Sequence, residues 1–333
     1  MSGDRRPSAA VYYLAPDHPA PSWGVGLLYH HVRLLRQGGF DAAILHHRFP
    51  FRIGWLDVEV PVRHLDAPGF APRPGDVLVV PEVLAREAAE RPLPCRRIVF
   101  VQGVFLILGP FAEAVDYPAL GYEGAIAILP HGQAVVERHF GLRPALVPPF
   151  VAPYFFARPE ELDGERRRRV LLVPKAGYRA AGLPDYDIVR KLVARKCRPA
   201  AAPEGPGWEL LELEGLGHRD VASAMRSAAF LVNVHSHEGF NTTVPEAMAS
   251  GCVALCYEAV GGRDFLVDRG NAFVFPNHDV YPLLDTLFDL MDRPDARRGE
   301  LARIRSQAFA TAGRFREEAT AAALTGFFRA LLE

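Results

Sequence analysis

The sequence predicts an α/β protein made of two doubly wound domains, each with a parallel sheet covered by helices. Short apolar runs alternate with amphipathic stretches almost throughout the chain. These runs lack the polar alternation of half-exposed strands, which is typical of a parallel sheet buried on both faces. The length of 333 residues is about twice that of an ordinary domain. Because 49% of the residues are apolar, each half can bury a core of its own.

The first half begins with a strand and a helix that the spacing of apolar residues defines. Residues 10–14 form an apolar run, and residues 24–37 carry Leu28, Val32 and Leu35 at helical spacing before two glycines end the pattern. Further strands are predicted at residues 42–45, 58–62, 77–80, 98–101 and 125–129, and a second helix at residues 133–140.

The rhythm of strands and helices weakens between residues 144 and 169, which hold five prolines and a run of four arginines. Such a stretch is typical of a linker, so we expect domains over residues 1–150 and 151–333. The last helix could pack back on the first domain. The second half predicts strands at 170–173, 208–213, 230–234, 253–257 and 272–275, and helices at 185–195, 220–228, 244–250, 281–292, 296–310 and 317–332.

Composition excludes several classes of function. The net charge is -1, which gives no support for bulk binding to nucleic acid or to an anionic membrane. The four cysteines lack paired spacing, so neither a zinc site nor a disulfide framework is indicated. The polar residues 1–8 do not form a secretory signal, and the most apolar segment, 98–115, is too interrupted to span a membrane. We therefore expect a soluble, cytoplasmic protein.

The most informative stretch is H-E-G-F-N-T-T-V-P-E-A-M-A-S-G, which follows an apolar strand and opens a helix. Gly239 lets backbone N–H groups approach a ligand, and the following helix N-terminus favours a phosphate. Glu238 and Glu246 flank the loop with seven residues between them. Because carboxylates repel phosphate, their natural targets are the hydroxyls of a ribose or a sugar. Together these features fit a nucleotide-sugar.

Both glutamates also have a simpler interpretation. Thr243 and Glu246 fit the S/T-x-x-E capping box, with Pro245 in the first turn, so Glu246 could cap its own helix. Glu238 could be a solvated loop residue.

This stretch closely resembles the E-x7-E motif of retaining family-4 glycosyltransferases of the GT-B fold, whose usual form is E-G-F-G-L-x-x-x-E-A-M-A-x-G. The resemblance covers most of the second half. It includes the segment Gly215-Leu216-Gly217-His218, the loop Gly261-Gly262, and Pro174-Lys175, which resembles the end of a strand in bacterial rhamnosyltransferase-like enzymes. The motif positions that match are Glu238, Gly239, Phe240, Glu246, Ala247, Met248, Ala249 and Gly251.

The resemblance implies two Rossmann-like domains facing a central cleft, with the acceptor bound by the first and the nucleotide-sugar by the second. It implies that Glu246 binds the ribose and Glu238 the transferred sugar, while Lys175 and Arg179 neutralise the pyrophosphate leaving group, on which charge develops. It implies no cofactor and no obligatory metal. A solvated surface charge is the alternative for Lys175 and Arg179. The backbone that would hold the diphosphate and sugar belongs to Gly239, Phe240, Asn241, Thr242 and Thr243.

One departure from the motif falls in this loop. Asn241-Thr242-Thr243 replaces the usual Gly-Leu-x after Phe240. Asn tolerates a left-handed backbone better than most residues, so the loop is expected to form.

The first half offers weaker candidates. Gly24 and Gly26 stand where relatives place a Gly-rich loop near the donor phosphate, although no third glycine completes a dinucleotide fingerprint. Gln102 ends a predicted strand and His131 lies in a predicted turn, so both are candidates for binding the acceptor or a sugar hydroxyl. A structural role serves His131 equally well. The apolar loop 105–111 is interpreted mainly as core, with an acceptor-side or membrane-touching surface as the alternative.

The sequence thus predicts a retaining glycosyltransferase that moves a sugar from a nucleotide-diphosphate sugar to an acceptor hydroxyl of a glycan, lipid or small molecule. Bacterial polysaccharide or glycoconjugate synthesis is the expected setting, with peripheral contact at the inner membrane face as an option. The alternatives are a nucleotide-sugar epimerase or sugar phosphorylase on the same fold, or a non-catalytic nucleotide-sugar-binding protein. No oligomeric state is predicted. Asp185-Tyr186-Asp187 has a D-x-D form, but its place at a helix start favours capping over metal binding.

Overall fold

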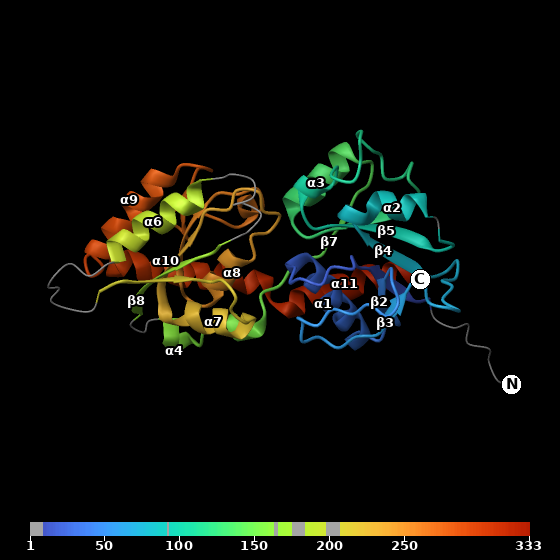
Figure 1. Ribbon diagram of the computed structural model, residues 1–333, viewed down its shortest axis with the longest axis horizontal. Helices are drawn as coiled ribbons and strands as arrows, with labels where there is room; N and C mark the ends of the chain where they lie inside the picture. Colours follow the sequence, from blue (N-terminus) through green and yellow to red (C-terminus); the bar gives the residue numbers. More distant parts are fainter. Residues whose placement is uncertain (1–8, 92, 163–165, 175–183, 198–206) are drawn as a thin grey trace. The chain divides into compact units, whose positions relative to one another are not determined.

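The computed structural model describes residues 9–91, 93–162, 166–174, 184–197 and 207–333. The chain divides into two compact units. Unit 1 comprises Met1–Pro149 and Glu318–Glu333, and unit 2 comprises Phe150–Glu317 (Figure 1). Each unit holds one sheet, and every strand pair within the two sheets is parallel. The predicted α/β fold with two doubly wound domains is confirmed.

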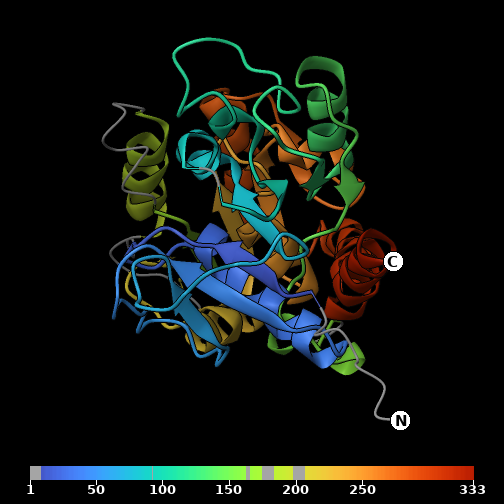
Figure 2. The same cartoon turned by 90° about the vertical axis from the view of Figure 1, so that its right-hand side faces the viewer.

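Unit 1 has a seven-stranded sheet in the order β3-β2-β1-β4-β5-β6-β7, whose strands have blue to green colours in Figure 2. The chain moves from β1 to one edge and then returns past β1 to the other. Right-handed crossovers therefore put the early helix on one face of the sheet and the later helices on the opposite face. The elements are β1 (Val11–Leu14), α1 (Trp23–Gln37), β2 (Ala42–His46), β3 (Val62–His64), β4 (Val77–Pro81), α2 (Ala85–Glu90), β5 (Arg96–Val101), β6 (Gly124–Ala127), α3 (Pro130–His139), β7 (Ala145–Leu146) and α11 (Glu317–Leu332).

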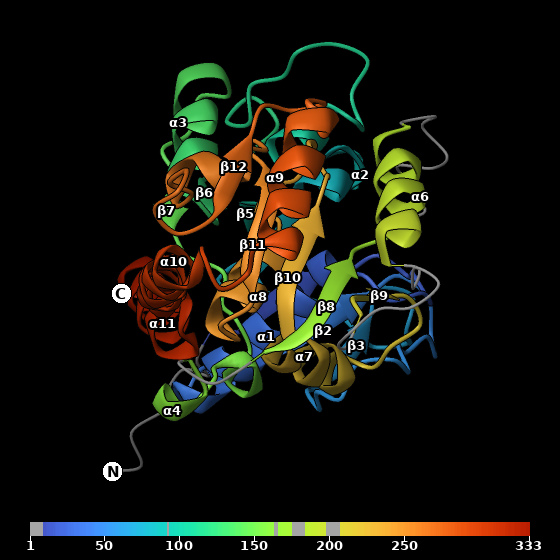
Figure 3. The same ribbon diagram turned by 90° about the vertical axis from the view of Figure 1, so that its left-hand side faces the viewer.

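Unit 2 has a five-stranded sheet in the order β12-β11-β10-β8-β9, seen in Figure 3. Helices α6 and α9 pack together on one face, whereas α7, α8 and α10 cover the other. The elements are η3 (Pro153–Phe155), α4 (Pro159–Leu162), β8 (Arg167–Leu172), α6 (Asp185–Cys197), β9 (Glu209–Glu212), α7 (His218–Ser227), β10 (Ala228–Asn233), α8 (Thr243–Ala249), β11 (Val253–Tyr257), η4 (Gly261–Asp264), β12 (Phe273–Phe275), α9 (Val280–Asp292) and α10 (Arg298–Ala312).

The last helix, α11, lies in unit 1 although it ends the chain. Phe328 is fully buried, and its ring lies 6.3 Å from the ring of Tyr13 and 6.4 Å from that of Phe40. The Arg96 guanidinium donates a hydrogen bond of 2.7 Å to the carbonyl of Leu331. These contacts attach the helix to the first sheet.

Three element predictions are wrong in detail. The strand expected at residues 58–62 begins only at Val62, directly after Pro61, whose carbonyl accepts from Ile44 of β2 but which has no N–H to donate. The segment 144–169 contains strand β7 and the first residues of strand β8, so it is not a simple linker. Helix α3 begins at Pro130, since proline fits the first helical position, and it therefore includes His131, which was expected in a turn. Among the described residues, no helix is long and apolar enough to cross a membrane.

Candidate functional site

The loop that carries the E-x7-E motif joins the end of β10 to the start of α8. Asn233, the last residue of β10, uses both ends of its amide to shape this loop. Its Nδ2 donates to Oδ1 of Asn241 at 2.7 Å, and its Oδ1 accepts from the backbone N–H of His235 at 3.0 Å. Asn241 has a φ of 59°, in the left-handed region. The expectation that Asn at this position would allow the loop to form is confirmed.

The loop that contains Gly261 and Gly262 packs against the motif loop. The N–H of Gly261 donates to the carbonyl of Glu238 at 3.1 Å. A Cβ on Gly261 would lie only 2.0 Å from the carbonyl oxygen of Gly239, so the approach requires glycine. The ring of Phe240 packs at 5.8 Å from Phe265 and at 4.9 Å from Phe315. The two loops that the sequence singled out in unit 2 are therefore adjacent.

Glu246 lies on α8 and is 5% exposed. Its Oε1 is 2.9 Å from Nε2 of His218, and the Nδ1 of that histidine is 2.6 Å from the hydroxyl of Tyr154. Burial raises the pKa of Glu246, whereas the hydrogen bond from His218 lowers it in part. Helix α8 has no side-chain cap, so the capping-box interpretation of Glu246 is wrong. Its carboxylate bonds to a side chain of α7 instead of to the backbone of its own helix.

Two aromatic contacts hold the histidine in place. The ring of Phe155 lies 4.9 Å from the ring of His218, and the guanidinium of Arg219 lies 4.7 Å from the Tyr154 ring centre. Sequence reasoning assigned no role to His218 or Tyr154. His218 stood in the G-L-G-H segment that resembles the family, and this was the signal that could have found it. Tyr154 stood in the proline-rich segment and gave none.

Three charged candidates of unit 2 remain, and the structure describes one of them. Glu238 is partly buried, at the point where the motif loop meets Gly261. Lys175 and Arg179 lie outside the described residues. The helix that follows them, α6, is anchored at its first residue, because Asp185 accepts hydrogen bonds from Tyr257 at 2.9 Å and from His278 at 2.7 Å.

This anchoring corrects the interpretation of the D-x-D segment. The carboxylate of Asp185 binds side chains at the end of β11 and after β12, so it does not act as a cap. The described part of the chain contains no cluster of three or more His, Cys, Asp or Glu side chains that could hold a metal ion.

In unit 1, two of the predicted residues meet. A Cβ on Gly24, at the start of α1, would lie 2.8 Å from Oε1 of Gln102, which follows β5. The backbone N–H groups of Gln102 and Gly103 donate to Oε1 of Glu82, at 3.1 and 2.8 Å. Glu82 is 1% exposed, and burial raises its pKa to about 7. Sequence reasoning missed this residue, although an acid directly after an apolar strand was a usable signal.

The remaining unit 1 candidates lie within helices. Gly26 is buried, and a Cβ there would lie 3.6 Å from the ring of Trp55. His131 is partly buried in the first turn of α3. The apolar loop after β5 also differs from its main interpretation as core. Phe105, Leu106 and Leu108 are 48%, 49% and 44% exposed, and only Ile107 between them is buried.

The two doubly wound units define the class of fold, which is GT-B. Comparison with solved structures agrees. Sucrose-phosphate synthase from Thermosynechococcus elongatus is similar with a TM-score of 0.69 at 12% identity, covering 97% of this chain and 99% of that one. Anabaena HepE in complex with UDP-glucose has a TM-score of 0.66 at 12% identity, covering 96% and 99%. Trehalose 6-phosphate synthase from Burkholderia multivorans has 0.58 at 13%, covering 98% and 96%.

Residues 204–293 match the family model described as "Glycosyl transferases group 1". This segment runs from before β9 to the end of α9 and contains the whole E-x7-E stretch. A search of curated proteins found no match. The chain therefore carries a glycosyltransferase group 1 segment on a GT-B scaffold, and the protein is a glycosyltransferase.

Proposed function

We propose that the protein is a retaining glycosyltransferase that moves a sugar from a nucleotide-diphosphate sugar to an acceptor hydroxyl. The observation that carries this proposal is the buried carboxylate of Glu246. This residue lies on α8, which opens directly after the E-G-F loop, and its carboxylate is held by His218 of α7. A carboxylate fixed in this way accepts hydrogen bonds from vicinal hydroxyls such as those of a ribose.

The remaining roles follow the order of groups along the donor. Glu238, at the opposite end of the motif, contacts the transferred sugar. Backbone groups of residues 239–243 hold the diphosphate, and Lys175 with Arg179 stabilises the charge that develops on the leaving phosphate. No obligatory metal is part of this mechanism. Asn241 adopts the left-handed conformation and the Glu238 carbonyl bonds to Gly261, so the departure from the motif leaves a formed loop for the donor.

Two structural neighbours guide the choice of donor and stereochemistry. HepE was crystallised with UDP-glucose and with UDP. A trehalose-6-phosphate synthase at a TM-score of 0.59 and 10% identity is described in a study of glycosyl transfer with retention. We therefore propose a uridine diphosphate sugar as the first donor to examine, and retention at the anomeric carbon.

The test combines binding with product analysis. UDP, GDP, dTDP and ADP sugars are screened for thermal stabilisation of the protein, because a ligand that binds the folded state raises its melting temperature. The stabilising donor is then incubated with glycan and lipid acceptors, and the anomeric configuration of the product is read by NMR. Glu238→Ala and Lys175→Ala are expected to abolish transfer with the fold intact, whereas Glu137→Ala on the exposed side of α3 leaves it unchanged. Full activity in either of the first two variants refutes the assignment.

The same incubations separate the alternative reactions. A product formed from the donor without any acceptor indicates an epimerase, and one formed only with added phosphate indicates a phosphorylase.

We also propose a cytoplasmic enzyme of polysaccharide or glycoconjugate synthesis that touches the inner membrane face. The support is the exposed apolar group formed by Phe105, Leu106 and Leu108, which suits an enzyme with a lipid-linked acceptor. A variant in which Phe105, Leu106 and Leu108 are all replaced by Ser is expected to co-sediment less with vesicles. Val267→Ser, at an exposed apolar position of unit 2, is expected to have no effect. Unchanged sedimentation of the triple variant removes the membrane proposal.

A further inference from the structure

A cavity of about 540 Å³ lies in unit 1 between α1 and residues 52–62. Tyr29 and Arg36, seven residues apart and thus on one face of α1, form one wall. Arg52, Glu59 and six apolar side chains from residues 53–62 form the other. Cavities of about 300–1,000 Å³ are the size that binds small molecules.

This cavity does not include the candidates Gly24 and Gln102, although its lining residue Leu56 lies beside Gly26. Gly24 and Gln102 lie at the start of α1 and at the carboxyl end of β5. The cavity instead extends to Arg36 in the last turn of α1 and to Val62, where β3 begins. Arg36 and Val62 are thus at the amino edge of the sheet, whereas Tyr29 contacts His46 at the carboxyl end of β2, so the cavity runs along α1 between the two edges.

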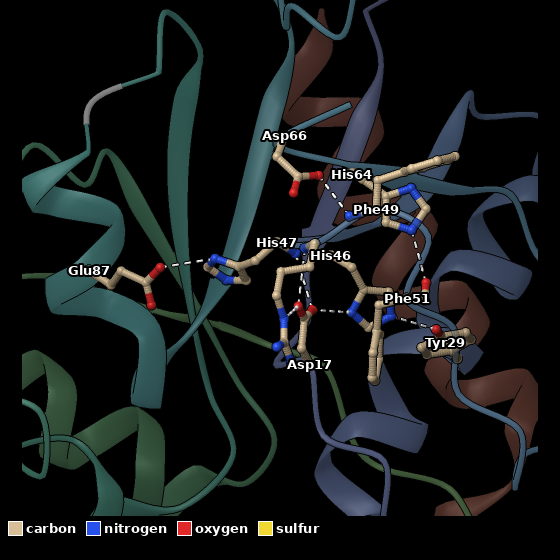
Figure 4. A network of polar contacts seen from close by, with 10 residues as sticks. Asp17, Tyr29, His46, His47, Phe49, Phe51, His64, Asp66 and Glu87 are labelled. Atoms are coloured by element: carbon tan, nitrogen blue, oxygen red, sulfur yellow. Dashed lines mark hydrogen bonds and ion pairs between the residues drawn. The ribbon is translucent and has the colours of Figure 1, made fainter. Parts of the chain in front are cut away.

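A buried chain of polar groups fixes the wall opposite α1 (Figure 4). His46, the last residue of β2, is fully buried, with Nδ1 3.0 Å from Oδ1 of Asp17 and Nε2 2.8 Å from the hydroxyl of Tyr29. Burial lowers the pKa of His46, so its ring is neutral at pH 7. Nδ1–H therefore donates to the carboxylate, and Nε2 accepts the Tyr29 hydroxyl proton. The Tyr29 oxygen in turn accepts the backbone N–H of Ile53.

Two further hydrogen bonds hold the same segment (Figure 4). Nε2 of His64 donates to the carbonyl of Phe51 at 2.8 Å, and the N–H of Phe49 donates to Asp66 at 2.7 Å. With Ile53, three alternate residues of the segment are thus attached to side chains of the sheet and its loops. The cavity wall is formed before any ligand arrives, which reduces the entropy lost on binding.

The charges of the cavity are unbalanced. In the described part of the chain, Arg52 makes no hydrogen bond or ion pair. Arg36 donates a hydrogen bond of 3.3 Å to the carbonyl of Ala42, and its 3.7 Å contact with Asp41 contributes little because the two side chains are 44% and 62% exposed. Among the residues that line the cavity, Glu59 is the one carboxylate beside these two guanidinium groups. The lining therefore combines a net positive charge with an apolar surface.

We propose that this cavity binds a small amphipathic anion, whose phosphate or carboxylate group is held by Arg52 and Arg36 and whose apolar body packs against residues 53–62. The guanidinium fork suits such oxyanions, and the apolar side chains exclude water from the contact. The proposed ligand has no nucleoside, so its binding can be tested separately from the proposed reaction.

Octyl phosphate is the probe, and octanol and inorganic phosphate are its two halves. We expect calorimetry to show binding of octyl phosphate at least tenfold tighter than binding of either half. Arg52→Ala weakens octyl phosphate binding about tenfold, and Tyr29→Phe, which releases the wall at Ile53, weakens it as well. Arg63→Ala is the matched control, because Arg63 is exposed on β3 and does not line the cavity.

Each contrary result has one meaning. Equal affinity for octanol and octyl phosphate shows an apolar contact without an anion site, and equal effects of Arg52→Ala and Arg63→Ala show binding elsewhere. Loss of octyl phosphate binding on addition of UDP shows that the probe occupies the donor site. Any of these results, or no binding of octyl phosphate at millimolar concentration, overturns the proposal.

Discussion

Glu246 shows how a carboxylate can be buried and still remain useful to a ligand. Burial raises its pKa, and the hydrogen bond from His218 opposes this rise. Because the pKa of Glu246 is raised, its carboxylate form is lost as the pH falls from neutral. If that form binds the ribose, donor affinity falls with it. His218 is then a positioning residue, which orients the carboxylate and keeps it ionised.

Replacing His218 tests this role. In His218→Ala the pKa of Glu246 rises further, because the group that lowers it is gone. We expect the donor KM to rise about tenfold, in line with the loss of a hydrogen bond to a charged group. The acid limb of the pH profile of kcat/KM moves to higher pH. His218→Gln, which can still donate to the carboxylate, recovers part of both. A pH profile that does not move in His218→Ala contradicts the positioning role.

At the scale of elements, the conformation of the motif loop depends on the loop at η4 that packs against it. Gly261 is the point of closest approach, since a Cβ there would lie 2.0 Å from the carbonyl oxygen of Gly239. This neighbour is backbone and cannot move aside without displacing Glu238 and Phe240. The neighbouring Gly262 has only the flexible side chain of Leu266 near its Cβ position, at 2.5 Å.

These two glycines form a matched pair of variants. Gly261→Ala is expected to reduce kcat/KM by at least 100-fold, because the motif loop must shift, while circular dichroism shows the fold retained. Gly262→Ala is expected to keep activity within a few-fold of the wild type. Equal activities of the two variants show that the contact between the loops does not shape the site.

The elements of the sheets were largely predictable from the sequence, whereas contacts across elements were not. The strand over residues 253–257 and the helix over 317–332 have the predicted bounds, because apolar runs and helical spacing are local properties. The start of β3 was placed too early because the apolar run 58–62 includes Pro61, which has no N–H for the ladder. Glu246 was recognised from its motif, but its partner His218 lies 28 residues away, a distance that no local pattern encodes.

At the scale of the whole molecule, buried histidines link the stability of unit 1 to pH. His31 on α1 is fully buried, with its ring 5.0 Å from that of Phe100. Burial lowers its pKa from 6.5 to about 3. Above pH 6.5 the histidine is neutral in both states. Below it the unfolded chain takes up a proton that the folded chain cannot accept, so stability falls as the pH drops toward 3.

The loss from His31 at pH 5 is about 2 kcal/mol relative to pH 7.5. His31→Leu removes the titrating group, so its free energy of unfolding should depend less on pH by that amount. Urea unfolding is followed by tryptophan fluorescence in a Trp208→Phe background, in which Trp23 and Trp55 report on unit 1 alone. The variant shares every other titrating side chain with the wild type. Parallel pH curves for the two proteins refute this account.

The chain passes from unit 1 to unit 2 and ends with a helix that belongs to unit 1 again. The core of unit 1 is therefore complete only when residues 318–333 are in place, although its sheet ends at β7. Phe328 carries most of this attachment, since it is fully buried against Tyr13 and Phe40, whereas the adjacent Phe327 is partly exposed. Two neighbouring phenylalanines on one helix thus differ mainly in the unit 1 surface that they bury.

Phe328→Ala is expected to destabilise unit 1 by about 3–4 kcal/mol, because it leaves a cavity in a packed core. Phe327→Ala, which removes the same atoms from a partly exposed position, should cost about 1 kcal/mol or less. Both are measured by urea unfolding in the Trp208→Phe background, and a Trp23→Phe, Trp55→Phe background reports on unit 2 through Trp208. If α11 serves unit 1 alone, the unit 2 transition is the same in both variants. A shift of that transition in Phe328→Ala shows instead that the two units unfold as one.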